Sequence, residues 1–345
     1  MIGVLLVDDS PSVRAVLRRF FSKTRDIRVV GEAVDGAQAV QMVIDLQPQV
    51  VVMDLQMPVL DGYAATERIM AVRPTPIVVL TSRANRNQMQ TAFEAMRRGA
   101  LEVLPKPEDT PSWQQLAESL PETVRTVALA QTAPRPARRA HAVRPEILVD
   151  SPRELRWVAI GASTGGPAAI RELLEEVPAD PPVGFLIVQH IASGFELGFA
   201  DWLNKEFPFD VRLAQDGEVL RRGMVRLAPG GSHLRLETGG VLHLDSQTPA
   251  RRGHRPSVDE LFQSCAESCP QQVAGVLLTG MGSDGVVGLL ALRKAGGITL
   301  VQDEASCVVF GMPRVALEKK AADVALPPRA LAQTLIRLWE KGGQP

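Results

Sequence analysis

Short apolar segments alternate with helical segments twice along this chain, once on each side of a connection rich in proline and arginine. This alternation is typical of a parallel sheet with helices on both faces. Ligands bind such sheets beyond the carboxyl ends of the strands, so the polar residues that follow each strand are the informative ones. The sequence therefore predicts two α/β domains, residues 1–107 and 156–345, joined by residues 108–155.

Polar side chains follow the predicted strands of the first domain. The five expected strands are Ile2–Val7, Arg28–Ala33, Val50–Met53, Ile77–Thr81 and Glu102–Leu104. Asp8, Asp9 and Asp54 follow the first and third strands, Thr81 ends the fourth, and Lys106 follows the fifth. Three converging carboxylates require a cation, and a few carboxylates with water suit Mg²⁺. With Thr81 and Lys106 available to hold an oxyanion, this edge is predicted to accept a phosphoryl group. Helix capping or solvation explains Asp8 or Asp9 singly, but not all five positions.

This stretch resembles the response-regulator receiver domain over essentially its full length. The matching motifs are Asp8-Asp9, Met53-Asp54-Leu-Gln-Met-Pro58 with Asp61-Gly62, Thr81-Ser82, and Lys106-Pro107. The resemblance implies a five-stranded, doubly wound, flavodoxin-like fold. It also implies that a histidine kinase phosphorylates Asp54, that Asp9, Asp54 and the Gln56 carbonyl ligate Mg²⁺ with Asp8 nearby, and that Thr81 and Lys106 take part in switching.

One position departs from the receiver pattern. Receivers usually carry Tyr or Phe three residues before the lysine, and Val103 stands there in this chain. An aromatic rotamer switch is therefore unavailable, whereas the Thr81 half of the switch is retained.

The connection has two parts. Trp113–Leu129 is predicted to be an amphipathic helix that closes the first domain, despite Pro121 inside it. Residues 131–145 are rich in proline, alanine and arginine, which predicts an extended basic linker. Five arginines between residues 135 and 153 raise the alternative of nucleic-acid binding, but no aromatic residue interleaves with them. We therefore expect no nucleic-acid partner.

The second domain opens with a strand, a glycine-rich turn and a helix. The strand covers Trp157–Ile160, the helix covers Ala168–Glu176, and Ser163 lies in the turn between them. Ser163 is a candidate nucleophile, because Gly161 to Gly165 match G-x-S-x-G. The turn is also a candidate phosphate cradle, although G-x-G-x-x-G and the Walker lysine are absent. In the third interpretation it is only a tight turn, with Ser163 as helix N-cap. This stretch alone leaves all three open.

Two further polar residues follow strands in the second domain. The strand Val183–His190 ends on His190, and Asp284 lies just beyond the strand Val273–Thr279. If these strands are parallel neighbours, Ser163, His190 and Asp284 face one crevice. Ser, His and Asp together supply a nucleophile, its base and the group that orients the base. Their order along the chain differs from the Ser…Asp…His order of α/β-hydrolases, so the motif does not indicate that fold.

An ester-cleaving site also needs donors for the developing oxyanion. Backbone N–H groups of the Gly280–Gly285 loop and of the helix start after Gly165 are the two candidates, and the sequence does not choose between them. The other histidines give weaker signals. His254 lies in the basic loop Arg251–Ser257, which we interpret as a solvated loop, with binding to an acidic partner as the alternative.

The second domain resembles the catalytic domain of the chemotaxis protein-glutamate methylesterase over nearly all of residues 156–345. The matching motifs are Ile160-Gly-Ala-Ser-Thr-Gly-Gly-Pro167, Val188-Gln-His190, Ala228-Pro-Gly230 with His233, Arg255-Pro-Ser-Val-Asp259, Leu278-Thr-Gly-Met-Gly-Ser-Asp-Gly285 and Gln302-Asp303. A receiver followed by this domain is also that family's architecture.

This resemblance implies hydrolysis of γ-glutamyl methyl esters on the cytoplasmic domains of chemoreceptors, with release of methanol. Some members also deamidate receptor glutamines. The implied roles are Ser163 as nucleophile, His190 as base and Asp284 as orienter, with the Met281 N–H as oxyanion donor and Thr164 close by. A chemotaxis histidine kinase is the implied phosphodonor. Mg²⁺ is expected for the receiver, and no cofactor for ester hydrolysis.

The family fold is a doubly wound parallel sheet with an antiparallel hairpin at one end. The segments that suit this β-rich part are Arg212–Leu213, Met224–Leu227, Arg235–Glu237 and Val241–Leu244. In the family the unphosphorylated receiver restrains the catalytic crevice. We therefore expect phosphorylation of Asp54, which adds about −1.5 to −2 charge, to raise kcat/KM.

Two other classes of function fit the sequence less well. An interaction protein with an idle catalytic half is disfavoured because all three catalytic positions are intact. A nucleotide-binding output domain is disfavoured because no acidic ribose partner stands at a suitable spacing.

Composition limits the surroundings in which the chain works. The net charge of −1 gives the protein no overall electrostatic attraction to nucleic acid or to an acidic membrane. The amino terminus enters a strand without a basic region or cleavage site, and no apolar run approaches about 18 residues. The three cysteines are interpreted as reduced thiols. We expect a cytoplasmic protein without membrane insertion.

Overall fold

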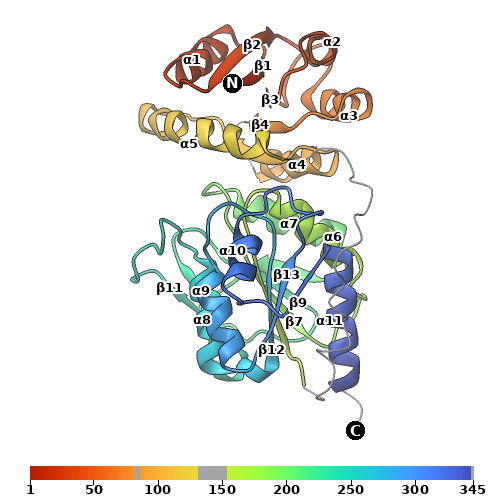
Figure 1. The fold of residues 1–345 in the computed structure, drawn as a ribbon, viewed down its shortest axis with the longest axis vertical. Coiled ribbons are helices and arrows are strands. Elements are labelled where there is room, and N and C mark those ends of the chain that lie inside the picture. The colour runs from red at the N-terminus through yellow and green to blue at the C-terminus, as the bar shows by residue number, and fades with distance from the viewer. Residues whose placement is uncertain (82–85, 131–153, 343–345) are drawn as a thin grey trace. The chain divides into compact units, whose positions relative to one another are not determined.

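The computed structural model describes residues 1–81, 86–130 and 154–342, without the side chains of residues 86–91 and 341–342. The chain divides into two compact units, Met1–Pro134 and Arg135–Pro345 (Figure 1). Ser82 of the predicted switch motif and the predicted linker, including His141, lie outside the described residues. No helix in the part of the chain that is described combines the length and apolar character needed to cross a membrane.

The first unit is a five-stranded parallel sheet in the order β2-β1-β3-β4-β5. Its elements are β1 (Ile2–Val7), α1 (Pro11–Ser22), β2 (Ile27–Ala33), α2 (Gly36–Leu46), β3 (Val50–Met53), α3 (Gly62–Val72), β4 (Ile77–Thr81), α4 (Arg86–Arg97), β5 (Glu102–Pro105) and α5 (Thr110–Ala128). The predicted doubly wound fold is confirmed, and the predicted strand ends differ from the observed ones by at most one residue.

The core of the first unit runs along its three inner strands. Val4, Val52 and Leu80 of the three inner strands are at most 1% exposed and pack with apolar side chains of α1 and α5. Helix α5 begins three residues before the predicted Trp113, because the Asp109 side chain caps it by accepting a hydrogen bond from the Ser112 N–H.

The second unit is built on a seven-stranded sheet in the order β14-β13-β12-β6-β7-β9-β8, in which all neighbours are parallel. The sheet strands are β6 (Trp157–Ala162), β7 (Gly184–Gln189), β8 (Asp210–Leu213), β9 (Met224–Leu227), β12 (Val273–Leu277), β13 (Ile298–Gln302) and β14 (Val324–Leu326). The helices are α6 (Gly166–Glu175), α7 (Glu196–Glu206), α8 (Val258–Ser268), α9 (Val286–Lys294), α10 (Met312–Glu318) and α11 (Pro328–Gly342).

The predicted antiparallel hairpin is confirmed. Strands β10 (His233–Leu236) and β11 (Leu242–Asp245) form it as a separate two-stranded sheet. The other two segments assigned to the β-rich part lie in β8 and β9, which extend the main sheet in parallel. Strand direction was not visible in the sequence, because it depends on the path of the connection and not on the apolar pattern within each strand.

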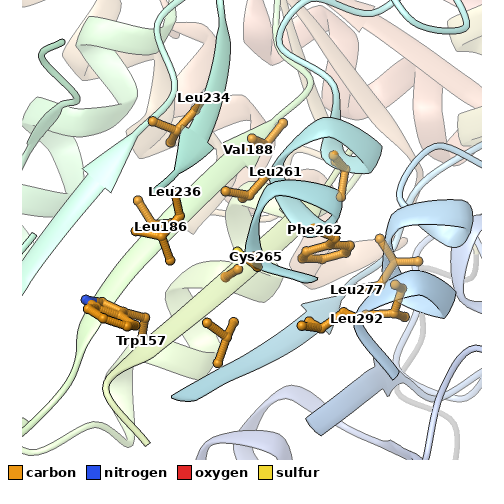
Figure 2. Packing of buried hydrophobic residues seen from close by; sticks show 14 of the residues in the cluster. Trp157, Leu186, Val188, Leu234, Leu236, Leu261, Phe262, Cys265, Leu277 and Leu292 are labelled. Atoms are coloured by element: carbon orange, nitrogen blue, oxygen red, sulfur yellow. The ribbon is translucent and has the colours of Figure 1, made fainter. Parts of the chain in front are cut away.

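The core of the second unit lies between one face of the sheet, α8, α9 and the hairpin. Figure 2 shows Leu186 and Leu277 of the sheet, Leu236 of the hairpin, and Phe262 and Cys265 of α8 in this cluster. Cys265 is fully buried, and burial raises the pKa of its thiol. All three cysteines are free.

Candidate active site

Ser163 follows β6 directly and lies in a turn that the backbone holds from both sides. Its N–H donates to the Thr279 carbonyl at 3.0 Å, and its own carbonyl accepts from the Gly166 N–H at 2.7 Å. The N-cap of α6 is Gly165, at φ 76°, and no side chain caps the helix. The interpretation of Ser163 as a helix cap is therefore wrong, because the αL turn at Gly165 starts the helix two residues later.

His190 follows β7, the strand next to β6. Its backbone N–H donates to the Ala162 carbonyl at 2.9 Å, which fixes it beside the turn that carries Ser163. Its Nε2 lies 2.9 Å from Asp284 Oδ2. A carboxylate only accepts hydrogen bonds, so Nε2 carries the hydrogen in the neutral ring. Nδ1 is then the basic nitrogen, and it is buried without a hydrogen-bond partner in the described part of the chain.

The structure thus brings the three sequence-predicted residues to the ends of neighbouring strands, since β6 lies between β12 and β7. His190 and Asp284 are joined by a hydrogen bond. Among the described residues, Ser163 Oγ makes no hydrogen bond to His190. Approach of Oγ to the free Nδ1 would complete the arrangement, and hydrogen bonds of this kind often shorten only when substrate binds.

Asp284 is held at the amino end of α8. Its Oδ1 accepts hydrogen bonds from Ser257 Oγ at 2.7 Å and from the Asp259 N–H at 3.1 Å. Its Oδ2 accepts a second bond, from the Val258 N–H at 2.7 Å. Burial opposes the charge, but the hydrogen bonds from His190, Ser257 and Val258 hold the pKa of Asp284 below its usual value. The carboxylate therefore stays ionised beside the imidazole.

The loop that carries Met281 passes directly beside Ser163. A Cβ added at Gly280 would lie 2.6 Å from the Ser163 Cβ, so only glycine fits there. Met281 follows with 57% of its surface exposed. Thr164 is partly buried, and its carbonyl accepts a hydrogen bond from Thr279 Oγ1 at 3.0 Å. Thr164 is the residue after Ser163, and Met281 follows Gly280, which lies against Ser163. Both predicted oxyanion residues therefore lie next to the turn that carries Ser163.

Gln189 was not among the predicted site residues, although it stands within the Val188-Gln-His190 motif. Its side-chain Nε2 donates to the carbonyls of both Ser163 and His190, each at 2.8 Å. One buried amide therefore ties the two strand ends together.

The loop Arg251–Ser257 was interpreted as solvated, and Arg252, Gly253 and Arg255 are indeed exposed, but the ring of His254 is partly buried. The His254 ring lies on the His190 ring with centroids 3.8 Å apart and planes 3° apart. Burial is the main cause that lowers the pKa of His254, and the neighbouring His190 lowers it further. Asp284 acts in the opposite direction. The local sequence gave no signal, because His190 lies far away along the chain. His233, in contrast, is buried away from these rings and bonds the Pro249 carbonyl and the Ser257 N–H.

The first unit holds a second polar cluster. Carboxylate oxygens of Asp8, Asp9 and Asp54 lie within 4.8 Å of one another. Lys106 Nζ lies 2.7 Å from Asp8 and 2.6 Å from Asp54. Thr81 is buried at the end of β4, and its carbonyl accepts a hydrogen bond from the Lys106 N–H at 2.7 Å. This all-oxygen, mostly carboxylate donor set fits a hard divalent cation.

Burial is the main influence on the charge of Asp54. It raises the pKa of the carboxyl above its ordinary value, although Lys106 and a backbone hydrogen bond from Gln56 act in the opposite direction. Burial would lower the pKa of Lys106, but its bonds to Asp54 and Asp8 outweigh this and raise the pKa. The ammonium therefore remains charged and neutralises part of the acidic cluster.

Comparison with known proteins gives two family matches. Residues 158–335 match the CheB methylesterase family, and residues 4–118 match the response regulator receiver domain. A protein-glutamate methylesterase/protein-glutamine glutaminase of Anaeromyxobacter dehalogenans is 42% identical over 342 residues, covering 98% of this chain and 99% of the relative. A relative with the same function in its name, from Symbiobacterium thermophilum, is 39% identical over 99% of this chain and 98% of its own.

A solved structure resembles the second unit. The CheB methylesterase catalytic domain of Thermotoga maritima superposes with a TM-score of 0.51 and 35% identity, covering 53% of this chain and 98% of that one. Together with the two family matches, this likeness shows that the chain belongs to the CheB methylesterase family of hydrolases and carries a response regulator receiver domain before its methylesterase domain.

Proposed function

We propose that this protein removes methyl groups from γ-glutamyl methyl esters on the cytoplasmic domains of chemoreceptors, and that Ser163, His190 and Asp284 carry out the hydrolysis. The observation that carries the proposal is the 2.9 Å bond between His190 Nε2 and Asp284 Oδ2. This bond holds the His190 ring at the carboxyl edge of the sheet, where Ser163 follows the adjacent strand β6. The names of relatives that match the chain over nearly its full length support the choice of substrate.

In the first half of the reaction, His190 Nδ1 takes the proton of Ser163 Oγ as the oxygen attacks the ester carbonyl. The resulting tetrahedral intermediate collapses as the C–O bond to methoxide breaks. The imidazolium returns its proton to that oxygen, and methanol leaves. In the second half, His190 takes a proton from water, the hydroxide attacks the acyl-serine, and glutamate is released with Ser163 reprotonated. Asp284 stays ionised throughout and stabilises the imidazolium.

Two positions are proposed to stabilise the oxyanion. The Met281 backbone N–H is the proposed donor, with Thr164 close to the same oxygen, because both adjoin the turn that carries Ser163. Loss of one such donor typically lowers the rate by about 10²–10³.

Deamidation of receptor glutamines is proposed as a second reaction of the same site. The acyl-serine formed from a glutaminyl side chain is identical, and ammonia replaces methanol as the leaving group. The names of the relatives include this activity.

The receiver unit is proposed to control the hydrolase. Asp9, Asp54 and the Gln56 carbonyl would hold Mg²⁺, with Asp8 nearby, and the ion would neutralise charge on an incoming phosphoryl group. A chemotaxis histidine kinase would supply the phosphoryl group to Asp54. Lys106 and Thr81 are the proposed partners of its oxygens. Phosphorylation is proposed to raise kcat/KM for ester hydrolysis, which is supported by the presence of both sites in one chain.

The test is release of labelled methanol from membranes that carry methyl-labelled chemoreceptors, with and without acetyl phosphate and Mg²⁺. Wild-type protein should release methanol, and Ser163→Ala should not. Ser119→Ala, on the exposed face of α5, is the matched control and should behave as wild type. Asp54→Asn should retain basal release but lose the response to phosphodonor. Equal release by the Ser163→Ala variant would exclude the proposed chemistry, and stimulation of Asp54→Asn would exclude the proposed control.

A further inference from the structure

The imidazole of His254 is presented by a tight turn at residues 251–254. The Arg251 N–H donates to the His254 carbonyl at 3.0 Å, and the His254 N–H donates back at 2.9 Å. Both central residues are left-handed, Arg252 at φ 51° and Gly253 at φ 86°. This conformation suits Gly253, whereas it is unfavourable for Arg252 by about 1–2 kcal/mol and needs support from outside the turn.

The two arginines of the turn supply that support. Arg251 Nη1 lies 2.7 Å from Glu260 Oε1 on α8. The Nε atoms of Arg251 and Arg252 each lie 3.6 Å from Oδ2 of Asp259, a fully buried carboxylate. Arg252 Nη1 also donates to Ser283 Oγ at 3.2 Å, next to Asp284. The turn is therefore attached both to α8 and to the loop that carries the proposed orienting carboxylate.

The turn thereby holds the His254 ring against the ring of His190, the proposed base. The His254 ring covers one face of His190 at 3.8 Å, nearly parallel to it, while the edge of His190 is held by Asp284. Neither ring nitrogen of His254 has a hydrogen bond within the described residues. The interaction that the turn gives this ring is therefore its stacking on His190. Two constraints, one at the edge and one on the face, together define the plane of the His190 ring.

We propose that His254 is a positioning residue for the base: it holds the His190 imidazole in the plane that aims Nδ1, and it must itself be uncharged when the base works. This inference rests on the proposed function, because it assigns His254 a role toward a base that is itself proposed. It adds a residue that the Ser-His-Asp arrangement does not contain.

The physical reason is the charge that His190 acquires when it takes the serine proton. A neutral aromatic face next to an imidazolium is favourable, by about 0.5–2 kcal/mol in comparable cation–π contacts. A protonated His254 at 3.8 Å would instead repel the imidazolium. Burial and His190 lower the pKa of His254, which keeps the ring neutral at pH 7.

The surrounding charges act on His254 in both directions. Asp284, from the loop after β12, favours the protonated form of His254, and the carboxylates Asp259 and Glu260 of α8 carry the same negative charge. Arg251 and Arg252 of the turn itself disfavour it, but both are paired with those carboxylates. For His254, burial and His190 together outweigh Asp284, so its neutral form is favoured.

The experiment measures methanol release by the full-length protein from methylated receptors, with kcat and KM determined separately across pH 5–9. We expect His254→Ala to lower kcat about tenfold with KM changed less than about twofold, a loss smaller than the about 10²–10⁴ of a missing general base. His254→Phe restores a flat ring and should return kcat at pH 8 to within about threefold of wild type. His243→Ala and His243→Phe, at an exposed histidine paired with Asp216, are matched controls and should have no effect.

The pH profile separates positioning from a merely structural role. As the pH falls, log(kcat/KM) of the wild type should decrease with a slope against pH that rises from one toward two, because both rings must be neutral. The slope for His254→Phe should stay at one. An unchanged kcat in His254→Ala, a His254→Phe variant as impaired as His254→Ala at pH 8, or the same acid limb in wild type and His254→Phe would each overturn the proposal.

A direct titration distinguishes this proposal from the proposed function. The ¹⁵N signals of His254 report its protonation in the full chain whether or not a substrate is turned over. They should show a pKa of His254 below its ordinary value in wild type and in Ser163→Ala. Absence of Ser163-dependent methanol release together with this lowered pKa would overturn only the proposed function. A pKa of His254 at or above its ordinary value in wild type would overturn the proposal of a neutral positioning ring even if methanol is released.

Discussion

The side-chain amide of Gln189 donates a 2.8 Å hydrogen bond to the backbone carbonyl of Ser163, 26 residues earlier in the chain. The same nitrogen donates to the carbonyl of His190 at 2.8 Å. The amide therefore joins the turn after β6 to the end of β7. It sets the relative position of the proposed nucleophile and base without touching either reactive side-chain atom.

Gln189→Ala should consequently lower kcat for ester hydrolysis by about 10- to 100-fold, because small displacements of reacting groups are costly. The two carbonyls also lose a buried donor, which should lower the free energy of unfolding by about 1–3 kcal/mol. Methanol release and urea unfolding measure the two effects. Gln215→Ala, at an exposed glutamine, is the control. A variant with wild-type kcat would show that the strand ends keep their spacing without this amide.

Asp284 should make the stability of the second unit depend on pH. Its pKa in the folded protein is held below the value of about 3.9 for an unfolded aspartate. Its charged form therefore stabilises the fold above about pH 4, and this contribution disappears as the pH falls through the lower, folded pKa. The difference in unfolding free energy between wild type and Asp284→Asn should thus be largest near pH 7 and shrink below about pH 4.

Urea unfolding at pH 7, 5, 4 and 3 measures this difference. Asp180→Asn is the matched control, because Asp180 lies exposed in an ion pair with Arg222. A difference for Asp284→Asn that stays constant over this range would contradict the stabilising role of the ionised carboxylate.

Lys106 should compete with Mg²⁺ for the acidic cluster. Its ammonium lies 2.7 Å from Asp8 and 2.6 Å from Asp54, where it neutralises the same oxygens that a cation needs. Lys106→Ala should therefore bind Mg²⁺ more tightly, by about tenfold or about 1.4 kcal/mol. It should also lose activation by acetyl phosphate. Calorimetric titration measures the affinity, and Lys23→Ala, at the only other lysine before residue 107, should leave it unchanged. Weaker Mg²⁺ binding by Lys106→Ala would contradict the competition.

Val103 cannot simply be replaced by the aromatic residue usual in receivers. The side chain is 1% exposed and lies in β5, opposite Val79 of β4. Val103→Tyr should lower the unfolding free energy of the first unit by about 1–3 kcal/mol, because extra volume in a packed core forces its neighbours apart. Urea unfolding checks this, with Val72→Tyr at an exposed position of α3 as control. An unchanged midpoint would mean that the region holds space for an aromatic switch.

Much of the architecture was predictable because it is encoded locally. Apolar runs such as Ile2–Val7 and Val50–Met53 are buried strands, and their limits agree with the structure. The polar residue after each run then falls at the carboxyl edge of a parallel sheet, whatever the remaining packing. This rule placed Ser163 and His190 at the ends of strands, and it brought them to one crevice only on the condition that those strands are parallel neighbours.

The sequence by itself therefore determined the order of strands and helices, the two α/β units and the chain positions from which polar groups reach the sheet edge. The tertiary structure decided the direction of β8 and β9, the bonds of Gln189 across two strands, and the placement of His254 on His190. The physical reason is the separation along the chain of the residues that make these contacts. Periodicity reports which face of one element is buried, whereas the Gln189–Ser163 and His254–His190 contacts join residues at least 26 positions apart, and strand direction depends on the path of a connection. Only the packed chain brings such partners together.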